Sequence, residues 1–161
     1  MLAGIKRVLD MKIHRGVVLF ALIVFACLPV VAEDTDRRYF KLPEMAALDL
    51  PFSDAVLVGD TLYLSGNGGI DVTDMSIPED PREEAKLLME NFKKTLALAD
   101  MTLDDLVSVT VYCPDLLLYS DFNDVYRSYF KKDFPARSFV GSGPLLFGMR
   151  FEMQGIAVKS P

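Results

Sequence analysis

The chain has 161 residues, of which 51% are hydrophobic and 25% are charged, and this composition indicates a folded globular protein and excludes a disordered one. Its length fits one domain with a short appendage. The formal net charge is −6, and because an acidic protein repels phosphate backbones, we expect no nucleic-acid partner.

The N-terminal segment, residues 1–32, has the form of a secretory signal peptide. Four basic residues precede an uncharged run at 16–32, which ends in the small residues Val30-Val31-Ala32. We predict cleavage after Ala32, which would make the protein secreted or periplasmic. The alternative is an uncleaved N-terminal membrane anchor, since an apolar run of this length is at the short edge of what spans a bilayer.

Cleavage would change the chemical inventory of the chain. The mature protein would have 13 basic and 22 acidic residues, a net charge of −9, and it would lose His14, the only histidine. Cys113 would be its only cysteine, so no internal disulfide could form. These losses exclude a Ser-His-Asp triad, a Cys-His pair and the usual zinc sites. No GxxxxGK[ST] motif is present, so a P-loop is excluded as well.

The first half of the chain predicts a linker and then a hairpin. Residues 33–49 are polar and then mixed, and we interpret them as a linker and lead-in. Residues 55–58 and 61–65 flank Gly59-Asp60, and two strand-like runs around a Gly-X pair predict a β-hairpin. The glycine cluster at 66–69 is interpreted as a turn or a close-approach loop, and 70–81 as a loop.

A helix is predicted to begin at Asp80, a suitable N-cap, with Pro81 in the first turn and Glu83 and Glu84 at the positive end of the helix dipole. Apolar residues then recur at steps of three and four as far as Ala99. The members of this stripe are Ala85, Leu88, Phe92, Leu96 and Ala99.

The second half of the chain predicts three strands and one helix. Residues 106–112 alternate and are β-branched, which is typical of a strand. Ser120 is expected to cap a helix over 121–132, and strands follow at 138–140 and 150–158. The order β-β-α-β-α-β-β predicts an α+β fold whose mixed sheet has both helices on one face. Because several strands are apolar on both sides, we expect oligomerisation to bury the second face.

An ordered set of motifs covers nearly the whole segment 50–161. The set runs through Pro51-Phe52-Ser53-Asp54-Ala55-Val56, Val58-Gly59-Asp60-Thr61-Leu62-Tyr63-Leu64-Ser65-Gly66, Asn91-Phe92-Lys93, Val109-Thr110-Val111-Tyr112, Phe122-Asn123-Asp124-Val125-Tyr126, Tyr129-Phe130, Pro135-Ala136-Arg137-Ser138 and Glu152-Met153-Gln154-Gly155-Ile156-Ala157-Val158. This pattern resembles the Rid (reactive intermediate deaminase) family, of which RidA/YjgF is the type. The resemblance implies a chorismate mutase-like α+β domain at 50–161 that forms a homotrimer, with three sites in clefts between subunits.

The resemblance also implies the principal site residue. The arginine of the family's Pro-Ala-Arg-Ser motif binds the substrate carboxylate, and here that residue is Arg137. The chemistry is suitable because a guanidinium stays charged and presents a planar fork to a carboxylate. On bare sequence, an arginine paired with a neighbouring carboxylate at a strand edge is the alternative.

Four other residues match family site positions. Glu152 matches a glutamate near the imine or the attacking water, where it could orient water or move a proton; the alternative is a solvated strand glutamate. Ser65 and Gly66 match a Ser-Gly pair that could offer a hydroxyl and a backbone N–H, or they simply end a strand. Asn123 matches a helix asparagine that supports the site, or it is a surface residue.

Two aromatic residues depart from the family pattern at the expected substrate site. Phe52 stands where the family often has tyrosine, so a hydroxyl near the substrate is absent. Phe139 stands where the family has cysteine or a similarly small residue, and it is expected to crowd the pocket. The usual Gln-Ile-Pro is replaced by Asn67-Gly68-Gly69, a more flexible wall.

The resemblance implies hydrolysis of 2-imino or enamine acids to 2-keto acids and ammonia, with no metal or organic cofactor, because the imine is already electrophilic. The expected partners are a small carboxylate-bearing imine or keto acid and two further copies of the chain. The membrane is involved only if the N-terminal segment is uncleaved. A second hypothesis is a non-catalytic trimer that binds small carboxylates or an envelope partner. A third, ribonuclease activity, is opposed by the acidic charge and the absent histidine.

Overall fold

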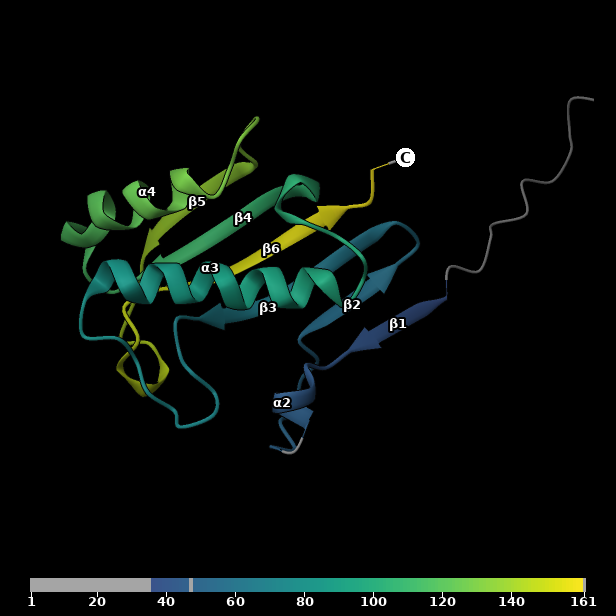
Figure 1. The fold of residues 1–161 in the computed structure, drawn as a ribbon, viewed down its shortest axis with the longest axis horizontal. Helices are drawn as coiled ribbons and strands as arrows, with labels where there is room; N and C mark the ends of the chain where they lie inside the picture. Colours follow the sequence, from purple (N-terminus) through teal and green to yellow (C-terminus); the bar gives the residue numbers. More distant parts are fainter. Residues whose placement is uncertain (1–35, 47, 161) are drawn as a thin grey trace, which may run out of the picture. The chain divides into compact units, whose positions relative to one another are not determined.

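The computed structural model describes residues 36–46 and 48–160 (Figure 1). The predicted signal peptide or membrane anchor at 1–32 lies outside the described residues. Within the described part of the chain, no helix combines the length and apolarity needed to cross a bilayer.

The centre of the domain is a six-stranded sheet with the strand order β1-β2-β3-β6-β4-β5. Neighbouring strands are antiparallel except β4 and β5, which are parallel, so the predicted mixed sheet is confirmed. The strands are β1 (Arg37–Phe40), β2 (Ala55–Val58), β3 (Thr61–Gly68), β4 (Leu106–Cys113), β5 (Ala136–Gly141) and β6 (Glu152–Val158).

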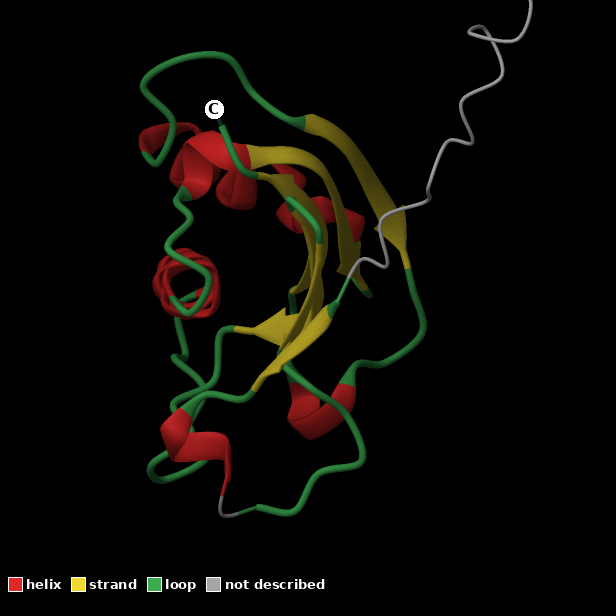
Figure 2. Cartoon of the chain, turned by 90° about the vertical axis from the view of Figure 1, so that its right-hand side faces the viewer, coloured by secondary structure: helices red, strands yellow, loops and turns green. Residues whose placement is uncertain are grey.

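Two helices, α3 (Pro81–Ala97) and α4 (Tyr119–Ser128), lie on the same side of this sheet, as predicted (Figure 1). Figure 2 shows α3 end-on beside the curved strands. The core fills the space between the helices and the sheet. Its largest fully buried side chains include Phe92, Phe122, Phe151, Leu62 and Leu88.

The start of α3 confirms the capping prediction. The Asp80 carboxylate accepts a hydrogen bond of 2.8 Å from the backbone N–H of Arg82, and Pro81 occupies the first turn. The predicted apolar stripe is buried, from Ala85 to Leu96. The helix ends at Ala97, two residues before the predicted end.

The bounds predicted for the second helix were wrong at both ends. The helix α4 begins at Tyr119 and ends at Ser128, not at 121 and 132. A 3₁₀ turn at Leu116–Leu118 runs directly into it, so Ser120 is not its cap. At the other end, the N–H of Tyr129 bonds back to the carbonyl of Tyr126 at 3.2 Å, which tightens and closes the last turn.

The segment predicted as a linker contributes an edge strand. Residues Arg37–Phe40 form β1, which pairs with β2 in the register Phe40↔Ala55, and a short helical turn α2 (Pro43–Ala46) follows. The predicted hairpin is confirmed: Val58 pairs with Thr61, and Gly59 supplies the positive φ of 57° that the turn requires. Strands β3 and β5 are longer than predicted, and β6 begins at Glu152, two residues after its predicted start.

The face of the sheet opposite the helices is partly apolar, and none of the residues that the structure describes forms a layer over it. A shallow hollow of about 230 Å³ lies over its centre, lined by residues that include Tyr63, Ser108, Gln154 and Ile156. Tyr63 is 50% exposed there. Burial of this face in an oligomer stays a prediction.

Candidate functional site

Arg137 occupies the edge strand β5, where its Cα pairs with that of Val109 on β4. Its side chain lies against α4, and Nη2 donates a hydrogen bond of 2.6 Å to Oδ1 of Asn123. The structure therefore brings two of the predicted site residues into direct contact. The amide of Asn123 fixes one side of the guanidinium fork and leaves the other side for a different partner.

Four aromatic rings surround the guanidinium of Arg137. The distances from its Cζ atom to the ring centroids are 4.6 Å for Tyr126, 5.9 Å for Phe139, and 6.0 Å for both Tyr119 and Phe122. A cation close to aromatic faces is stabilised by the ring quadrupoles. Phe139, which was expected to crowd the site, forms one wall of this aromatic enclosure.

Two buried polar atoms in the enclosure have no hydrogen-bond partner among the described residues: Nη1 of Arg137 and the hydroxyl of Tyr126. An unpaired buried donor costs free energy, more so when it is charged. Burial raises the pKa of Tyr126 to about 12, against the opposing effect of the Arg137 charge, so this hydroxyl stays protonated at neutral pH. Both atoms can therefore donate to an anion.

Glu152, Gly66 and Ser65 belong to a second cluster, where β3 pairs with β6. A Cβ atom on Gly66 would meet Oε1 of Glu152, so the carboxylate lies directly on this glycine. The hydroxyl of Ser65 donates to the carbonyl oxygen of Ser53 at 2.5 Å, so its proton is already used in a hydrogen bond within the chain. Phe52, the residue before Ser53, is 47% exposed.

The two clusters lie on opposite faces of the sheet. A Cβ atom on Gly155 would meet the ring of Phe92, so Gly155 faces α3. Side chains alternate along a strand, and Glu152, three residues earlier, therefore faces away from the helices. Arg137 faces α4, which packs beside α3. One chain thus unites Arg137, Asn123 and Phe139 but does not bring Glu152 to them.

Sequence reasoning missed the aromatic enclosure. Phe122 and Tyr126 lie within the helix predicted at 121–132, and Tyr119 lies just before it. Helical spacing could have indicated Tyr119 as a neighbour of the site, because it lies four residues before Asn123 and so shares the same helix face. The pKa of Tyr119 is lowered first by the side chain of Asn123 and then by the charge of Arg137, which agrees with this proximity.

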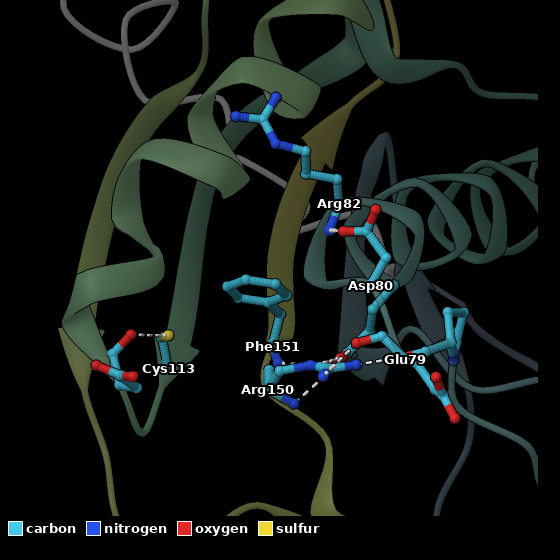
Figure 3. A network of polar contacts seen from close by, with 9 residues as sticks. Glu79, Asp80, Arg82, Cys113, Arg150 and Phe151 are labelled. Atoms are coloured by element: carbon cyan, nitrogen blue, oxygen red, sulfur yellow. Dashed lines mark hydrogen bonds and ion pairs between the residues drawn. The ribbon is translucent and has the colours of Figure 1, made fainter.

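The segment that leads into β6, and with it Glu152, is held by the buried carboxylate of Glu84, which the sequence had indicated only as a residue at the positive end of the helix dipole. Glu84 on α3 is 0% exposed; Oε1 accepts the backbone N–H groups of Arg150 at 2.6 Å and Phe151 at 3.1 Å. Its Oε2 accepts from Nε of Arg150 at 2.5 Å. The same guanidinium donates to the carbonyls of Glu79, at 2.9 Å, and of Pro78, so it ties the loop before α3 to β6 (Figure 3).

The glycine cluster at 66–69 was predicted as a turn or a close-approach loop, but residues 66–68 form the end of strand β3; the close approach of other segments is present. A Cβ atom on Gly69 would meet the backbone oxygen of Glu84, and one on Gly68 would meet the sulfur of Met149. Asn91, buried on α3, donates to the carbonyls of Gly68 at 3.1 Å and Ile70 at 3.0 Å. Within residues 36–46 and 48–160, the structure contains no cluster of metal-ligating side chains.

The mixed sheet, the two helices on one face and the arginine beside the edge strand together define a RidA-like α+β domain. The family model described as Endoribonuclease L-PSP matches residues 44–159. The chain belongs to this family, the RidA/YjgF-type Rid proteins.

Relatives cover most of the chain. A 2-iminobutanoate/2-iminopropanoate deaminase of Bos taurus is 38% identical over 126 residues, which are 78% of this chain and 92% of the relative. The crystal structure of RidA from an Antarctic Psychrobacter is 30% identical with a TM-score of 0.70, covering 76% of this chain and 100% of that one. Escherichia coli TdcF with bound serine is 29% identical with a TM-score of 0.66, covering 69% and 90%.

Proposed function

We propose that this protein hydrolyses 2-imino or enamine acids to 2-keto acids and ammonia, with Arg137 binding the substrate carboxylate. The observation that carries the proposal is the buried Nη1 of Arg137, which has no partner among the described residues while Nη2 is held by Asn123. A carboxylate would satisfy this donor with a charge-assisted hydrogen bond. Relatives named as imine deaminases and a relative with bound serine, itself a carboxylate, support this assignment.

The reaction needs water, proton transfers and orientation. Water adds to the imine carbon to form a carbinolamine, the nitrogen takes up a proton, and the C–N bond breaks to release ammonia and leave the keto acid. A carboxylate such as Glu152 can take the proton from water and return it to the leaving nitrogen. Holding the substrate by its carboxylate beside that group supplies much of the acceleration by proximity.

The separation of the two clusters supports a site completed between subunits. Arg137 with Asn123 and Phe139 forms one half on the helix side, and Glu152 with Gly66 forms the other half on the open side of the sheet. A homotrimer in which neighbouring copies supply complementary halves would unite them. This assembly would also bury the sheet face opposite the helices, which the described residues of one chain leave accessible to solvent.

The decisive experiment supplies imines by the action of an amino-acid oxidase and measures how the protein competes with semicarbazide for them. We expect faster appearance of keto acid and less semicarbazone, in proportion to protein added. Absence of any effect would refute the deaminase proposal. If keto acids then raised the melting temperature without turnover, the non-catalytic carboxylate-binding alternative would hold.

The proposal places the reaction outside the cytoplasm or at its membrane, because the N-terminal segment has the form of a signal peptide or an anchor. Mass spectrometry of the protein recovered from an exporting host distinguishes the two. A mature N-terminus at Glu33 means cleavage, whereas an intact N-terminus in the membrane fraction means anchoring.

Gly66→Ala should lower kcat/KM by at least about tenfold, since general acid–base groups contribute about 10²- to 10⁴-fold and the new methyl group displaces the Glu152 carboxylate. The atom that it meets is the end of a flexible side chain, so the melting temperature should change little. Gly143→Ala is the matched control, because nothing lies within 4 Å of its Cβ position. Unchanged kinetics in Gly66→Ala would argue against a role for Glu152.

A further inference from the structure

The aromatic enclosure of Arg137 has a buried side and an accessible side. Phe122 is 0% exposed and Tyr126 is 3% exposed, and both belong to the core, so they form a floor. Tyr119 is 48% exposed, and Phe139 is a partly buried residue at the margin of the core. Their rings meet edge to face with centroids 5.0 Å apart, and the Phe139 ring also packs on the floor ring of Phe122 with centroids 5.5 Å apart.

We propose that Tyr119 and Phe139 form an aromatic cover over Arg137 that a substrate must displace, and that this cover makes the site select 2-imino acids with bulky apolar side chains. The inference rests on the proposed function and specifies its substrate class. It assigns to two residues a specificity role that is distinct from the carboxylate binding by Arg137.

The cover follows from the burial of the unpaired donor. Nη1 of Arg137 is fully buried and has no partner in the described part of the chain. The floor rings are held in the core, and Nη2 is occupied by Asn123. Of the four rings, Tyr119 and Phe139 are the two outside the buried core, so they are the ones that a carboxylate approaching Nη1 would turn aside.

Tyr119 and Phe139 occupy positions that allow their side chains to rotate. Tyr119 is the first residue of α4; its backbone N–H bonds to the carbonyl of Leu116, but its side chain is 48% exposed. Phe139 lies on β5, an edge strand with a single hydrogen-bonded neighbour, β4. Rotation of either side chain leaves the sheet in place, although rotation of Phe139 also gives up its contact with the Phe122 ring.

Selectivity among 2-imino acids follows from the apolar surface that is exposed when Tyr119 or Phe139 turns aside. When a ring turns aside, its contacts with the other ring and with the guanidinium are lost, and a small ligand leaves the uncovered surface in water. A ligand with a bulky apolar side chain covers that surface again and recovers the hydrophobic free energy.

The test compares the imines made from alanine and from phenylalanine. We expect the unmodified protein to favour the phenylalanine-derived imine by about tenfold in kcat/KM, the scale at which apolar pockets discriminate. Phe139→Ala should raise kcat/KM for the alanine-derived imine by about tenfold and so bring the kcat/KM values of the two imines closer together. Phe139→Leu should keep most of the preference, because it retains apolar bulk. Tyr39 is 63% exposed on the distant strand β1, so Tyr39→Ala should leave kcat/KM for both imines unchanged.

The outcomes separate this inference from the proposed function. If the unmodified protein hydrolyses both imines and a folded Phe139→Ala variant leaves their ratio unchanged, the cover is refuted and the deaminase proposal stands. If neither imine is hydrolysed, the deaminase proposal fails. Calorimetric affinities for pyruvate and phenylpyruvate then decide the cover separately: a preference for phenylpyruvate that narrows in Phe139→Ala supports it, and equal affinities or no binding overturn it.

Discussion

Arg137→Ala is expected to lower kcat/KM for imine hydrolysis by roughly two to three orders of magnitude, since truncating one partner of a buried, hydrogen-bonded charge pair costs about 2–5 kcal/mol. The loss should appear for small and bulky substrates alike, because every substrate of the proposed class carries the carboxylate. Arg137→Lys should recover only part of the activity, because an ammonium keeps the charge but lacks the planar fork.

The stability of Arg137→Ala distinguishes a binding role from a structural one. The buried Nη1 group of Arg137 has no partner among the described residues, so truncation of the side chain removes a desolvation cost. The same truncation removes the hydrogen bond to Asn123, which has the opposite effect on stability. We therefore expect the melting temperature to change by only a few degrees. Arg127→Ala, an exposed site on the same helix α4, controls for the loss of one positive charge. Full activity in Arg137→Ala would end the proposal that Arg137 binds the carboxylate.

Glu84→Ala is expected to destabilise the fold by about 3–5 kcal/mol, the usual cost of breaking a buried ion pair. The carboxylate is 0% exposed and accepts three hydrogen bonds, two from the backbone N–H groups of Arg150 and Phe151 just before β6 and one from the Arg150 side chain. Alanine would leave all three donors without this acceptor. Thermal unfolding followed by circular dichroism should show a fall of roughly 10 °C or more.

Glu83→Ala is the matched control for this prediction. Glu83 is the neighbouring residue on α3, and its side chain is 55% exposed and pairs with Lys86 at 2.6 Å. An exposed pair of this kind contributes about 0–1 kcal/mol, so this variant should unfold close to the temperature of the unmodified protein. Equal melting temperatures for Glu84→Ala and Glu83→Ala would show that the Glu84–Arg150 network does not hold β6.

Elements with strong local signals were predictable from sequence. The start of α3 required only the cap at Asp80 and Pro81 beside it, and the hairpin required only Gly59 between two strand-like runs. Elements that depend on partners were not predictable. Strand β1 consists of Arg37–Phe40, whose residues are mostly exposed, and it is a strand because its backbone pairs with β2. The end of α4 depends on the turn at Tyr129 rather than on helix propensity.

The sequence by itself determined the family, the order of the main elements and the identity of Arg137 and Glu152 as candidate site residues, because ordered motifs and local periodicity are properties of the chain. Only the tertiary structure decided which side chains meet. The face on which a strand residue lies depends on register and pairing, and these place Arg137 against α4 and Glu152 on the opposite side of the sheet. The aromatic enclosure likewise arises from the packing of α4 on β5, which brings together residues distant in sequence.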